Sequence, residues 1–366
     1  MQSGNLMSSA AQLAQLSLSK RGLPLLKDED FLYCPVRHLN VDVEATEQLT
    51  FAFTKNVQNI VDSSLWHTHF ASLTHSENDP FALQCLAHTT GPQEYSLKQS
   101  DSELQINSST NVDTHKFGHL FVHACKGSSN RILALLDHTL AGKPNNLLID
   151  ILVDADARLD WFQLTPKQPL STQVIRYRII LQGKQSCFYL NSALFGMKTQ
   201  RISYKVFLEG EHSEFKVSSR VLQNAQMHTH QHLHLVHHAA NTKSSQNFRL
   251  VGMEESQTSV DGKVEIAPNA AGTQAEQIIR NLLLSRQAKA SGKPTMKIFN
   301  PDVQCSHGYT TGNLSSEELF YMNSRGVPNV LARKVLTRAF LNSDQPESTP
   351  LAYLEALNQE ESKYDF

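Results

Sequence analysis

Short runs of apolar residues, separated by polar turns, fill the chain from about residue 147 onward. They recur at roughly ten-residue spacing, and many alternate apolar with polar positions, as strands with one buried face do. This pattern predicts a mainly β fold and leaves a barrel, a sandwich and a β-helix open. The predicted strands are Leu147–Val153, Thr172–Leu181, Ser186–Leu190, Arg201–Leu208, Glu214–Leu222, Met227–Val236, Phe248–Val251, Lys263–Ala267 and Thr295–Phe299.

The first 95 residues mix helical and irregular signals. Apolar residues recur at helical spacing over Ala10–Leu16 and, less completely, over Val57–Leu65. We therefore predict a mostly helical domain over residues 1–95 and a β core over residues 96–314. Another amphipathic stretch, Ser128–Ala141, also has helical spacing and ends near a Lys-Pro step that breaks the chain.

Helical signals return in residues 315–366. Ser315 and Glu318 form an S-x-x-E capping box ahead of an apolar run, and a glycine and a proline then supply stop and restart signals. Further helices are predicted over Asn329–Leu341 and Leu351–Gln359. By itself, such a helical end is typical of a cap on a repetitive β core.

The composition and the missing motifs exclude several classes of protein function. The chain has 366 residues and a net charge of −2, which gives no basic surface for nucleic acid or an anionic membrane. It has no run of eighteen apolar residues and no basic-then-apolar start of the secretory kind, so we expect a cytoplasmic protein. P-loop, dinucleotide, HExxH and nucleophile-elbow motifs are missing from the sequence, so any ATP hydrolysis in its pathway must come from a partner. We expect the chain itself to be non-catalytic.

The cysteines are scattered, with no C-x-x-C pair among them. An odd number of cysteines without a signal peptide predicts reduced thiols. A ferredoxin-type site needs several closely spaced thiolates, so the chain alone is not expected to hold a stable iron–sulfur cluster. The five are Cys34, Cys85, Cys125, Cys187 and Cys305.

The block from Val260 to Val327 contains four ordered motifs. They are NLLLS at Asn281–Ser285, KP-x-M-x-I at Lys293–Ile298, DV-x-CSHG at Asp302–Gly308 and LFYM-x-SRG at Leu319–Gly326. In order and sequence these motifs resemble the C-terminal core of the SufB/SufD family, the scaffold subunits of the SUF iron–sulfur cluster assembly complex. Four ordered motifs are far more specific than a single glycine pattern.

Individual positions favour the SufD branch of that family. Arg280-Asn281-Leu282 stands where SufB-like chains carry Cys-Asp-Ser, and Ser306-His307-Gly308 stands where they carry His-Glu-Ala. The resemblance extends from about His232 to Phe340. A Trp-Lys-Tyr-Thr motif common near the N-terminus of the family is present only as the degenerate Phe31-Leu32-Tyr33-Cys34.

The resemblance implies a right-handed parallel β-helix with helical regions at both ends. It implies a SufD-like scaffold subunit that pairs with a SufB-like paralogue and a SufC-like ATPase, with a homodimer as the form of the chain alone. The C-terminal helices, with Arg333 and Arg338, would dock the ATPase. The cargo would be transient iron or a nascent iron–sulfur cluster, with no cofactor bound tightly to the isolated chain, and a role for reduced flavin in the complex is left open.

Cys305 and His307 lie two residues apart, so both side chains lean to one side of what the sequence predicts to be an extended turn. Thiolate and imidazole are good ligands for ferrous iron or a cluster in transfer, but two ligands leave positions that another chain must fill. On spacing alone a structural role is favoured. The resemblance implies instead that His307 faces a cysteine of the SufB-like partner where the nascent cluster forms.

A run of histidines offers an alternative function. Alternate imidazoles on one strand share a face, so His230 and His232 are candidate zinc or iron ligands of a metal-dependent β-helix or cupin-like enzyme. Four such side chains span roughly 20 Å, so one ion reaches at most two of them, and a polar face is favoured. The run comprises His228, His230, His232, His234, His237 and His238.

Four aspartates form an acidic run at the start of the β region. The run lacks the glycine and the spaced glutamate of a calcium loop, which favours a solvated edge. The residues are Asp150, Asp154, Asp156 and Asp160.

Overall fold

The structure of the chain is a computed structural model. It describes residues 11–12, 14–16, 46–48, 58–59, 64–71, 73, 79–89, 91–98, 103–107, 115–136, 144–343, 346 and 349–364. The degenerate motif Phe31–Cys34 lies outside the described residues, and so does most of the predicted helical stretch Val57–Leu65.

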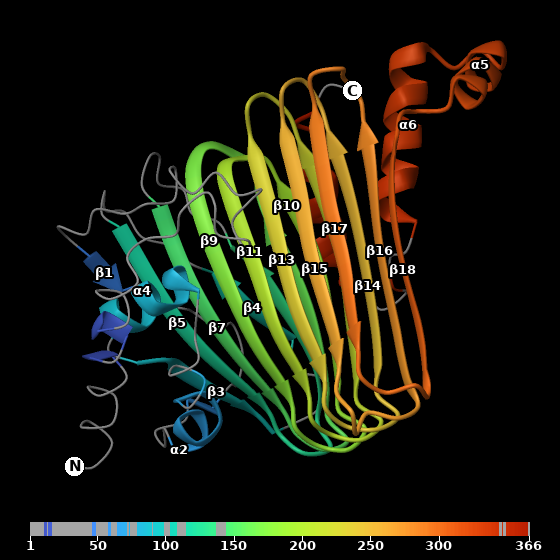
Figure 1. Cartoon of the computed structure of the whole chain (residues 1–366). Coiled ribbons are helices and arrows are strands. Elements are labelled where there is room, and N and C mark those ends of the chain that lie inside the picture. The colour runs from blue at the N-terminus through green and yellow to red at the C-terminus, as the bar shows by residue number, and fades with distance from the viewer. Residues whose placement is uncertain are drawn as a thin grey trace.

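Two sheets form the body of the molecule, and from β3 onward the chain passes from one sheet to the other after each strand (Figure 1). The first sheet has the order β17-β15-β13-β11-β9-β7-β5-β3-β2, with β1 beside β5, and the second has the order β18-β16-β14-β12-β10-β8-β6-β4. Pairing is parallel throughout except between β2 and β3. The result is a β-solenoid of about seven turns, which confirms the predicted parallel β-helix.

Every strand predicted from periodicity overlaps a strand of the structure. The bounds are β1 Thr46–Gln48, β2 Gln58–Asn59, β3 Gln93–Leu97, β4 Glu103–Asn107, β5 His115–Ala124, β6 Ser129–Leu135, β7 Pro144–Val153, β8 Arg158–Thr165, β9 Gln168–Leu181, β10 Cys187–Phe195, β11 Met197–Leu208, β12 Glu214–Gln223, β13 His228–His237, β14 Lys243–Gly252, β15 Gln257–Ile266, β16 Thr273–Leu283, β17 Lys289–Ile298 and β18 Val303–Gly312.

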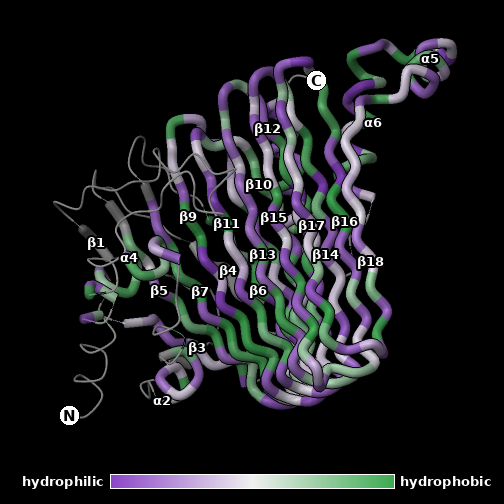
Figure 2. Tube along the Cα trace, viewed as in Figure 1, coloured by the Kyte–Doolittle hydropathy of each residue, from purple (hydrophilic) through white to green (hydrophobic). Residues whose placement is uncertain are grey.

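Successive coils of the solenoid stack in register. Thr199 on β11 lies beside His228 on β13, which lies beside Gln257 on β15. Because strand side chains alternate, one set points inward and forms a continuous apolar core, and the hydropathy alternates along many strands (Figure 2). Aromatic rings follow the same register: Tyr177 stacks on Tyr204 with ring centroids 5.5 Å apart. Stacking of successive coils in register therefore builds the core.

The turns at one end of the solenoid stack so closely that a side chain has no room. A Cβ added at Gly183, between β9 and β10, would lie 2.0 Å from the backbone nitrogen of Ala155 in the preceding coil. We expect Gly183→Ala to lower the free energy of unfolding by about 1–3 kcal/mol, because the two backbones must move apart. Chemical denaturation measures this loss.

Gly308→Ala is the matched control, since a Cβ there has no neighbouring atom within 4 Å. Its expected change in unfolding free energy is within about 0.5 kcal/mol. Equal losses in the two variants would contradict the role of close stacking at Gly183.

Helical segments of the N-terminal region cover the outer face of the first sheet near β5, β7 and β9. They include α2 Ser64–Trp66, the π-helical turn η3 His67–Ala71 and α4 Pro80–His88. The Asp79 carboxylate caps α4 by accepting a hydrogen bond from the Phe81 N–H at 3.0 Å. A second apolar cluster lies under these segments: Ala14, Trp66, Phe70, Ala82, Leu83, Cys85, Leu86, Phe117, Phe121, Leu148, Leu152 and Ile180.

Three helices follow the last strand, as the sequence predicts: α5 Ser316–Ser324, α6 Asn329–Asn342 and α7 Leu351–Glu361. The Ser315 hydroxyl accepts a hydrogen bond from the Glu318 N–H at 3.3 Å, which confirms half of the predicted capping box. Among the described helices, none has the length and apolar character needed to span a lipid bilayer.

Helices α6 and α7 pack on the outer face of the second sheet, whereas α5 projects away from the body (Figure 1). Tyr364, just after α7, is buried there, and its hydroxyl accepts from the Gly196 N–H and donates to the Leu222 carbonyl. No residue of α5 is buried. The C-terminal region is therefore anchored through α6 and α7, and α5 is left to the solvent.

The structure corrects the helical interpretation of Ser128–Ala141, because its described part contains strand β6. Ile132 and Ala134 belong to the solenoid core, whereas Leu133 packs in the cluster under α6 and α7. Both faces of this strand are apolar, and periodicity does not separate such a strand from an amphipathic helix. Strands β1 to β5, β8, β16 and β18 likewise had no predicted counterpart.

Candidate functional site

Strands β17 and β18 are the last strands of the two sheets, and within the described residues no further strand pairs with their outer edges. Such edges can accept a strand from another chain. Strand β17 carries Lys289, Lys293, Pro294 and Lys297, which are residue types that protect edges from pairing. Strand β18 contains no lysine, arginine or proline. It is therefore the edge better suited to pair with another chain.

His307 lies near the middle of β18, beside Gln277 of β16, and is exposed. Cys305 and Tyr309 point to the same side of the strand because they occupy alternate positions. Cys305 packs partly against the solenoid core, and burial raises the pKa of its thiol. The Tyr309 hydroxyl donates to the Ala290 carbonyl of β17 at 3.4 Å. This edge therefore presents the His307 imidazole more openly than the Cys305 thiol.

The prediction of a turn at Cys305–Gly308 is wrong, because all four residues lie inside β18. Gly308 is not among the glycines with a positive φ, and a Cβ there would meet nothing. Neither backbone freedom nor a close approach within the chain therefore requires glycine at this position. The regular strand still places Cys305 and His307 on one side, as their spacing indicated.

Strand β13 holds the histidine run except His238, and the even-numbered histidines of the strand point to the outer face because Leu233 and Leu235 belong to the core. His230 is buried, and its Nδ1 lies 2.7 Å from the Ser259 hydroxyl on β15. His237 points to the opposite face, where its ring nitrogens contact hydroxyls of two neighbouring residues. The strand therefore does not direct all its imidazoles to one point.

Burial lowers the pKa of these imidazoles: that of His237 to about 3, that of His234 to about 4, and those of His230 and His232 well below the ordinary value. They are neutral at neutral pH, the form that ligates metals. Among the described residues, however, no group of three or more His, Cys, Asp or Glu is arranged to hold a metal ion. The described geometry therefore gives the metal-dependent enzyme no ligand set.

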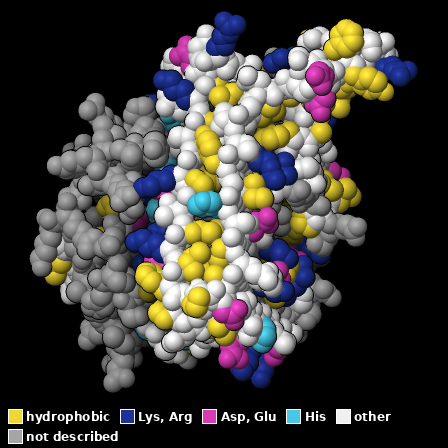
Figure 3. Space-filling view, turned by 45° about the vertical axis from the view of Figure 1, so that its right-hand side comes forward, with side chains coloured by type: hydrophobic (Ala, Val, Ile, Leu, Met, Phe, Trp, Pro, Cys, Tyr) yellow, Lys and Arg dark blue, Asp and Glu magenta, His cyan; other side chains and the backbone are white. Residues whose placement is uncertain are grey.

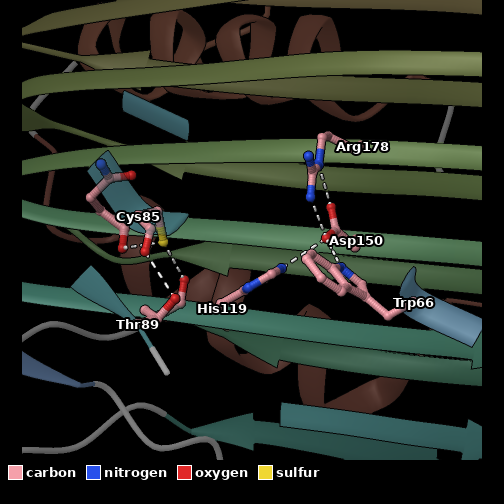
Figure 4. Close-up of polar contacts among 8 residues, drawn as sticks. Trp66, Cys85, Thr89, His119, Asp150 and Arg178 are labelled. Atoms are coloured by element: carbon pink, nitrogen blue, oxygen red, sulfur yellow. Dashed lines mark hydrogen bonds and ion pairs between the residues drawn. The ribbon is translucent and has the colours of Figure 1, made fainter. Parts of the chain in front are cut away.

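Asp150 lies in a fully buried polar network, so the prediction of a solvated acidic edge is wrong for it (Figure 4). Its carboxylate accepts hydrogen bonds from Arg178 at 2.6 Å, from the Trp66 indole at 2.6 Å and from His119 at 2.8 Å. Asp160 is buried as well. The partners of Asp150 lie 28, 84 and 31 residues away in sequence, which is why no local pattern revealed the network.

The projecting helical end carries exposed large apolar side chains (Figure 3). Their exposed fractions range from 43% to 75%, which is unusual for a cluster of this size on a soluble surface. The sequence predicted helices at α5 and α6, but its pattern does not distinguish an apolar face turned to the core from one turned to a partner. We call this set the apolar helix surface: Phe320, Tyr321, Val330, Leu331 and Val335.

The two arginines predicted to bind a partner have different surroundings. Arg333 donates to the Leu284 carbonyl at 3.4 Å and lines a hollow of about 470 Å³ between α6 and the ends of the last strands. Arg338 donates to Glu361 at 2.5 Å and to Asn358 at 3.0 Å, which ties α6 to α7. Arg333 therefore lines a hollow beside α6, and Arg338 holds two helices together.

Residues 105–340 match the family described as SUF system FeS cluster assembly, SufBD core domain. This range covers more than half of the chain and contains nearly all of the solenoid, including the edge strand β18. The chain belongs to the SufBD family.

Curated relatives of this SufBD family chain cover shorter stretches. An iron–sulfur cluster assembly SufBD family protein of Synechocystis is 34% identical over 179 residues, which are 48% of this chain and 39% of the relative. The iron–sulfur cluster assembly protein SufD of Escherichia coli is 30% identical over 106 residues, 29% of this chain and 25% of the relative. The chloroplastic protein ABCI7 of Arabidopsis thaliana is 36% identical over 91 residues, 25% of this chain and 19% of the relative. The chain therefore spans less than half the length of each of these relatives.

Proposed function

We propose that this SufBD family chain is a SufD-like scaffold subunit that pairs with a SufB-like paralogue and a SufC-like ATPase in the cytoplasm. The observation that carries the proposal is the exposed His307 on β18, the less protected of the two terminal edges. A scaffold that shares its cargo with a partner needs a ligand at a subunit boundary, and His307 meets that need.

The cargo in this proposal is transient iron or a nascent iron–sulfur cluster. His307 supplies a nitrogen ligand, and Cys305, which is partly buried, is a weaker candidate for a second ligand. These two groups leave coordination positions open, so the paralogue supplies the remaining ligands. A strand of the paralogue pairing with β18 would bring them to the same boundary, and two copies of this chain would meet there when the paralogue is absent.

The ATPase in this proposal docks on the apolar helix surface. Helix α5 buries none of its own residues, and α6 carries three of the exposed apolar side chains as well as Arg333, which lines the hollow. Exposed apolar clusters of this kind mark protein–protein contacts. The sequence contains no P-loop, so the partner binds and hydrolyses the ATP.

Co-expression with both partners tests the proposal. We expect the chain to co-purify with the paralogue and the ATPase, and recovery as a lone monomer would contradict the assignment.

Two variants separate the docking surfaces. Phe320→Asp and Val330→Asp should each weaken ATPase binding by about tenfold or more, because a carboxylate in an apolar contact loses its hydration. Pairing with the paralogue should be unchanged. Affinity measurement on the purified scaffold pair checks both results.

Leu170→Asp is the matched control, because Leu170 is 66% exposed and lies on β9, four strands from the edge strand β17. Arg333→Glu tests whether the charge of Arg333 contributes to ATPase binding. Arg338→Glu would also break the contact with Glu361, so a loss of binding could then result from a change in the fold. Normal ATPase binding by both aspartate variants would place the docking site elsewhere.

A further inference from the structure

A cysteine, a histidine and an aspartate meet at the stacked turns of two early coils. His123 lies on β5, Cys125 just after it, and Asp154 just after β7. The His123 Nε2 is 2.8 Å from the Asp154 carboxylate, and its Nδ1 is 3.7 Å from the Cys125 sulfur. A thiol beside an imidazole that a third group orients is the arrangement found in cysteine nucleophiles.

Coil stacking produces this arrangement. The Asp154 N–H donates to the Ala124 carbonyl at 3.0 Å, so the turn after β7 lies directly on the turn after β5. His123 and Asp154 are 31 residues apart in sequence, which is about one coil, so no local sequence motif predicts their contact. Cys125 is half-buried, which leaves the sulfur accessible to a small reagent.

The charges around His123 favour an imidazolium. Burial opposes its protonation, but the hydrogen bonds with Asp154 and Cys125 outweigh burial and raise the pKa of His123 to about 9. The hydrogen bond from His123 lowers the pKa of Asp154, and the nearby His69 acts in the same direction. Ser96 also faces His123, with its hydroxyl 3.5 Å from the Nδ1. At neutral pH the sulfur therefore lies beside a positive charge held in place by a carboxylate.

We propose that Cys125 is a nucleophilic thiol that accepts electrophilic sulfur from a small disulfide or persulfide. The Cys125 sulfur attacks one sulfur of the donor, a new S–S bond forms, and the donor S–S bond breaks. The donor leaves as a thiolate that takes up the proton lost by Cys125, so atoms and electrons balance without an outside oxidant. The His123 imidazolium stabilises the negative charge that develops on the attacking sulfur. This inference does not rest on the proposed function.

The backbone of the same turn argues for sulfur exchange rather than acyl transfer. Acyl transfer needs free N–H groups to hold an oxyanion. Here the amide of Cys125 donates to the Leu97 carbonyl, that of Lys126 to Asp154, and that of Gly127 to the Ala155 carbonyl. The amide of Ser128 donates back to Cys125. Sulfur exchange needs only the nucleophile and a leaving thiolate.

Other cysteines of the described chain are internal controls. Burial raises the pKa of Cys85 to about 12, and its sulfur donates to the Gly118 carbonyl. Cys187 is half-buried like Cys125, but burial and the charge of Glu214 raise its pKa. Cys187 is therefore the matched comparison: a similarly accessible thiol without an imidazolium beside it.

The first experiment measures iodoacetamide labelling of each cysteine in the full chain by mass spectrometry. The His123 imidazolium, whose Nδ1 is 3.7 Å from the Cys125 sulfur, stabilises the negative charge of the attacking sulfur, so we expect Cys125 to react on the order of tenfold faster than Cys187. Because both rates come from one sample, no variant is needed. A ratio below about threefold overturns the proposal.

The second experiment uses Asp154→Asn, which removes the charge that orients His123. Cys125 labelling should slow by about fivefold while Cys187 labelling is unchanged. Asp156→Asn, in the same turn, is the matched control and should alter neither rate. An unchanged Cys125 rate in Asp154→Asn overturns the proposal. Labelling of the buried Cys85 would show that the variant has partly unfolded. In that case the ratio of Cys125 to Cys187 labelling in the wild-type chain tests the proposal.

The third experiment distinguishes the two sulfur sources with glutathione disulfide and glutathione persulfide. We expect one of them to modify Cys125 before Cys187, with release by a reductant. A glutathione adduct identifies disulfide exchange, and addition of a single sulfur atom identifies persulfide transfer. Modification of Cys125 by both reagents no faster than of Cys187 overturns the proposal.

Discussion

Replacing His307 with alanine should abolish iron–sulfur cluster maturation in cells while leaving the fold and the assembly nearly intact. The imidazole is exposed on β18, so its removal creates no cavity in the core. Under the proposed function it is the ligand that this chain offers at the subunit boundary. Loss of a ligand that the neighbouring chain does not duplicate removes the cargo site itself.

Complementation of a strain that depends on this pathway measures the effect. Ser306→Ala, which alters the next side chain on the opposite side of β18, is the matched control and should rescue growth. Cys305→Ala should be milder than His307→Ala, because its thiol is partly packed against the core. Full rescue by His307→Ala at normal protein levels would remove the main support for the proposed function.

Asp150→Asn should lower the free energy of unfolding by roughly 3–5 kcal/mol, the range measured when one partner of a buried ion pair is removed. Asp150 and Arg178 are both fully buried, and the guanidinium donates two hydrogen bonds of 2.6 Å. The variant leaves that charge buried without its carboxylate. It also weakens the contact with Trp66, which holds α2 on the sheet.

The pH dependence of this variant follows from the direction of the pKa shift. Burial alone would raise the pKa of Asp150, but Arg178 and His119 outweigh burial and hold it below the ordinary value of 3.8. A depressed carboxyl pKa contributes stability that is present above that ordinary value and is lost as the pH falls through the folded-state value. The stability difference between the wild type and Asp150→Asn should therefore be constant near neutral pH and shrink below pH 3.8.

Two further variants check the cause. Asp156→Asn removes a carboxylate from a surface turn and should change stability by no more than about 0.5 kcal/mol. The double variant Asp150→Asn/Arg178→Met should recover part of the loss, because no unpaired charge then remains. A loss in Asp150→Asn no larger than that in Asp156→Asn would show that the buried pair does not stabilise the fold.

The strand pattern was predictable because a solenoid core repeats a simple rule. Alternation along each strand is local, and the runs at Thr172–Leu181 and Met227–Val236 show it directly. Strand β6 was not predicted because both of its faces are apolar: Leu133 packs against the C-terminal helices on the face opposite the core. The choice of a β-helix over a barrel came from the family resemblance, since the pairing of Thr199 with His228 connects residues one coil apart.

The sequence singled out the residues of the candidate site, but it did not predict how they are arranged in space. The spacing of Cys305 and His307 correctly placed both on one side, yet the expected turn is a regular edge strand. The networks around Asp150 and His123 join residues of different coils, and a sequence read in order holds no signal for them. Register between coils is a tertiary property, and the chain encodes it through the whole stack rather than through a motif.

The unequal edges β17 and β18 have a consequence for how much of this protein a cell can safely make. A bare strand edge pairs with any compatible edge, including that of another copy or of a misfolded chain. Lysines and a proline protect the edge of β17 from pairing, but β18 contains no lysine or proline and carries His307. Under the proposed function, each copy synthesised in excess of the SufB-like paralogue therefore adds to the burden of chaperones and proteases, and we expect selection to match the synthesis rates of the two chains.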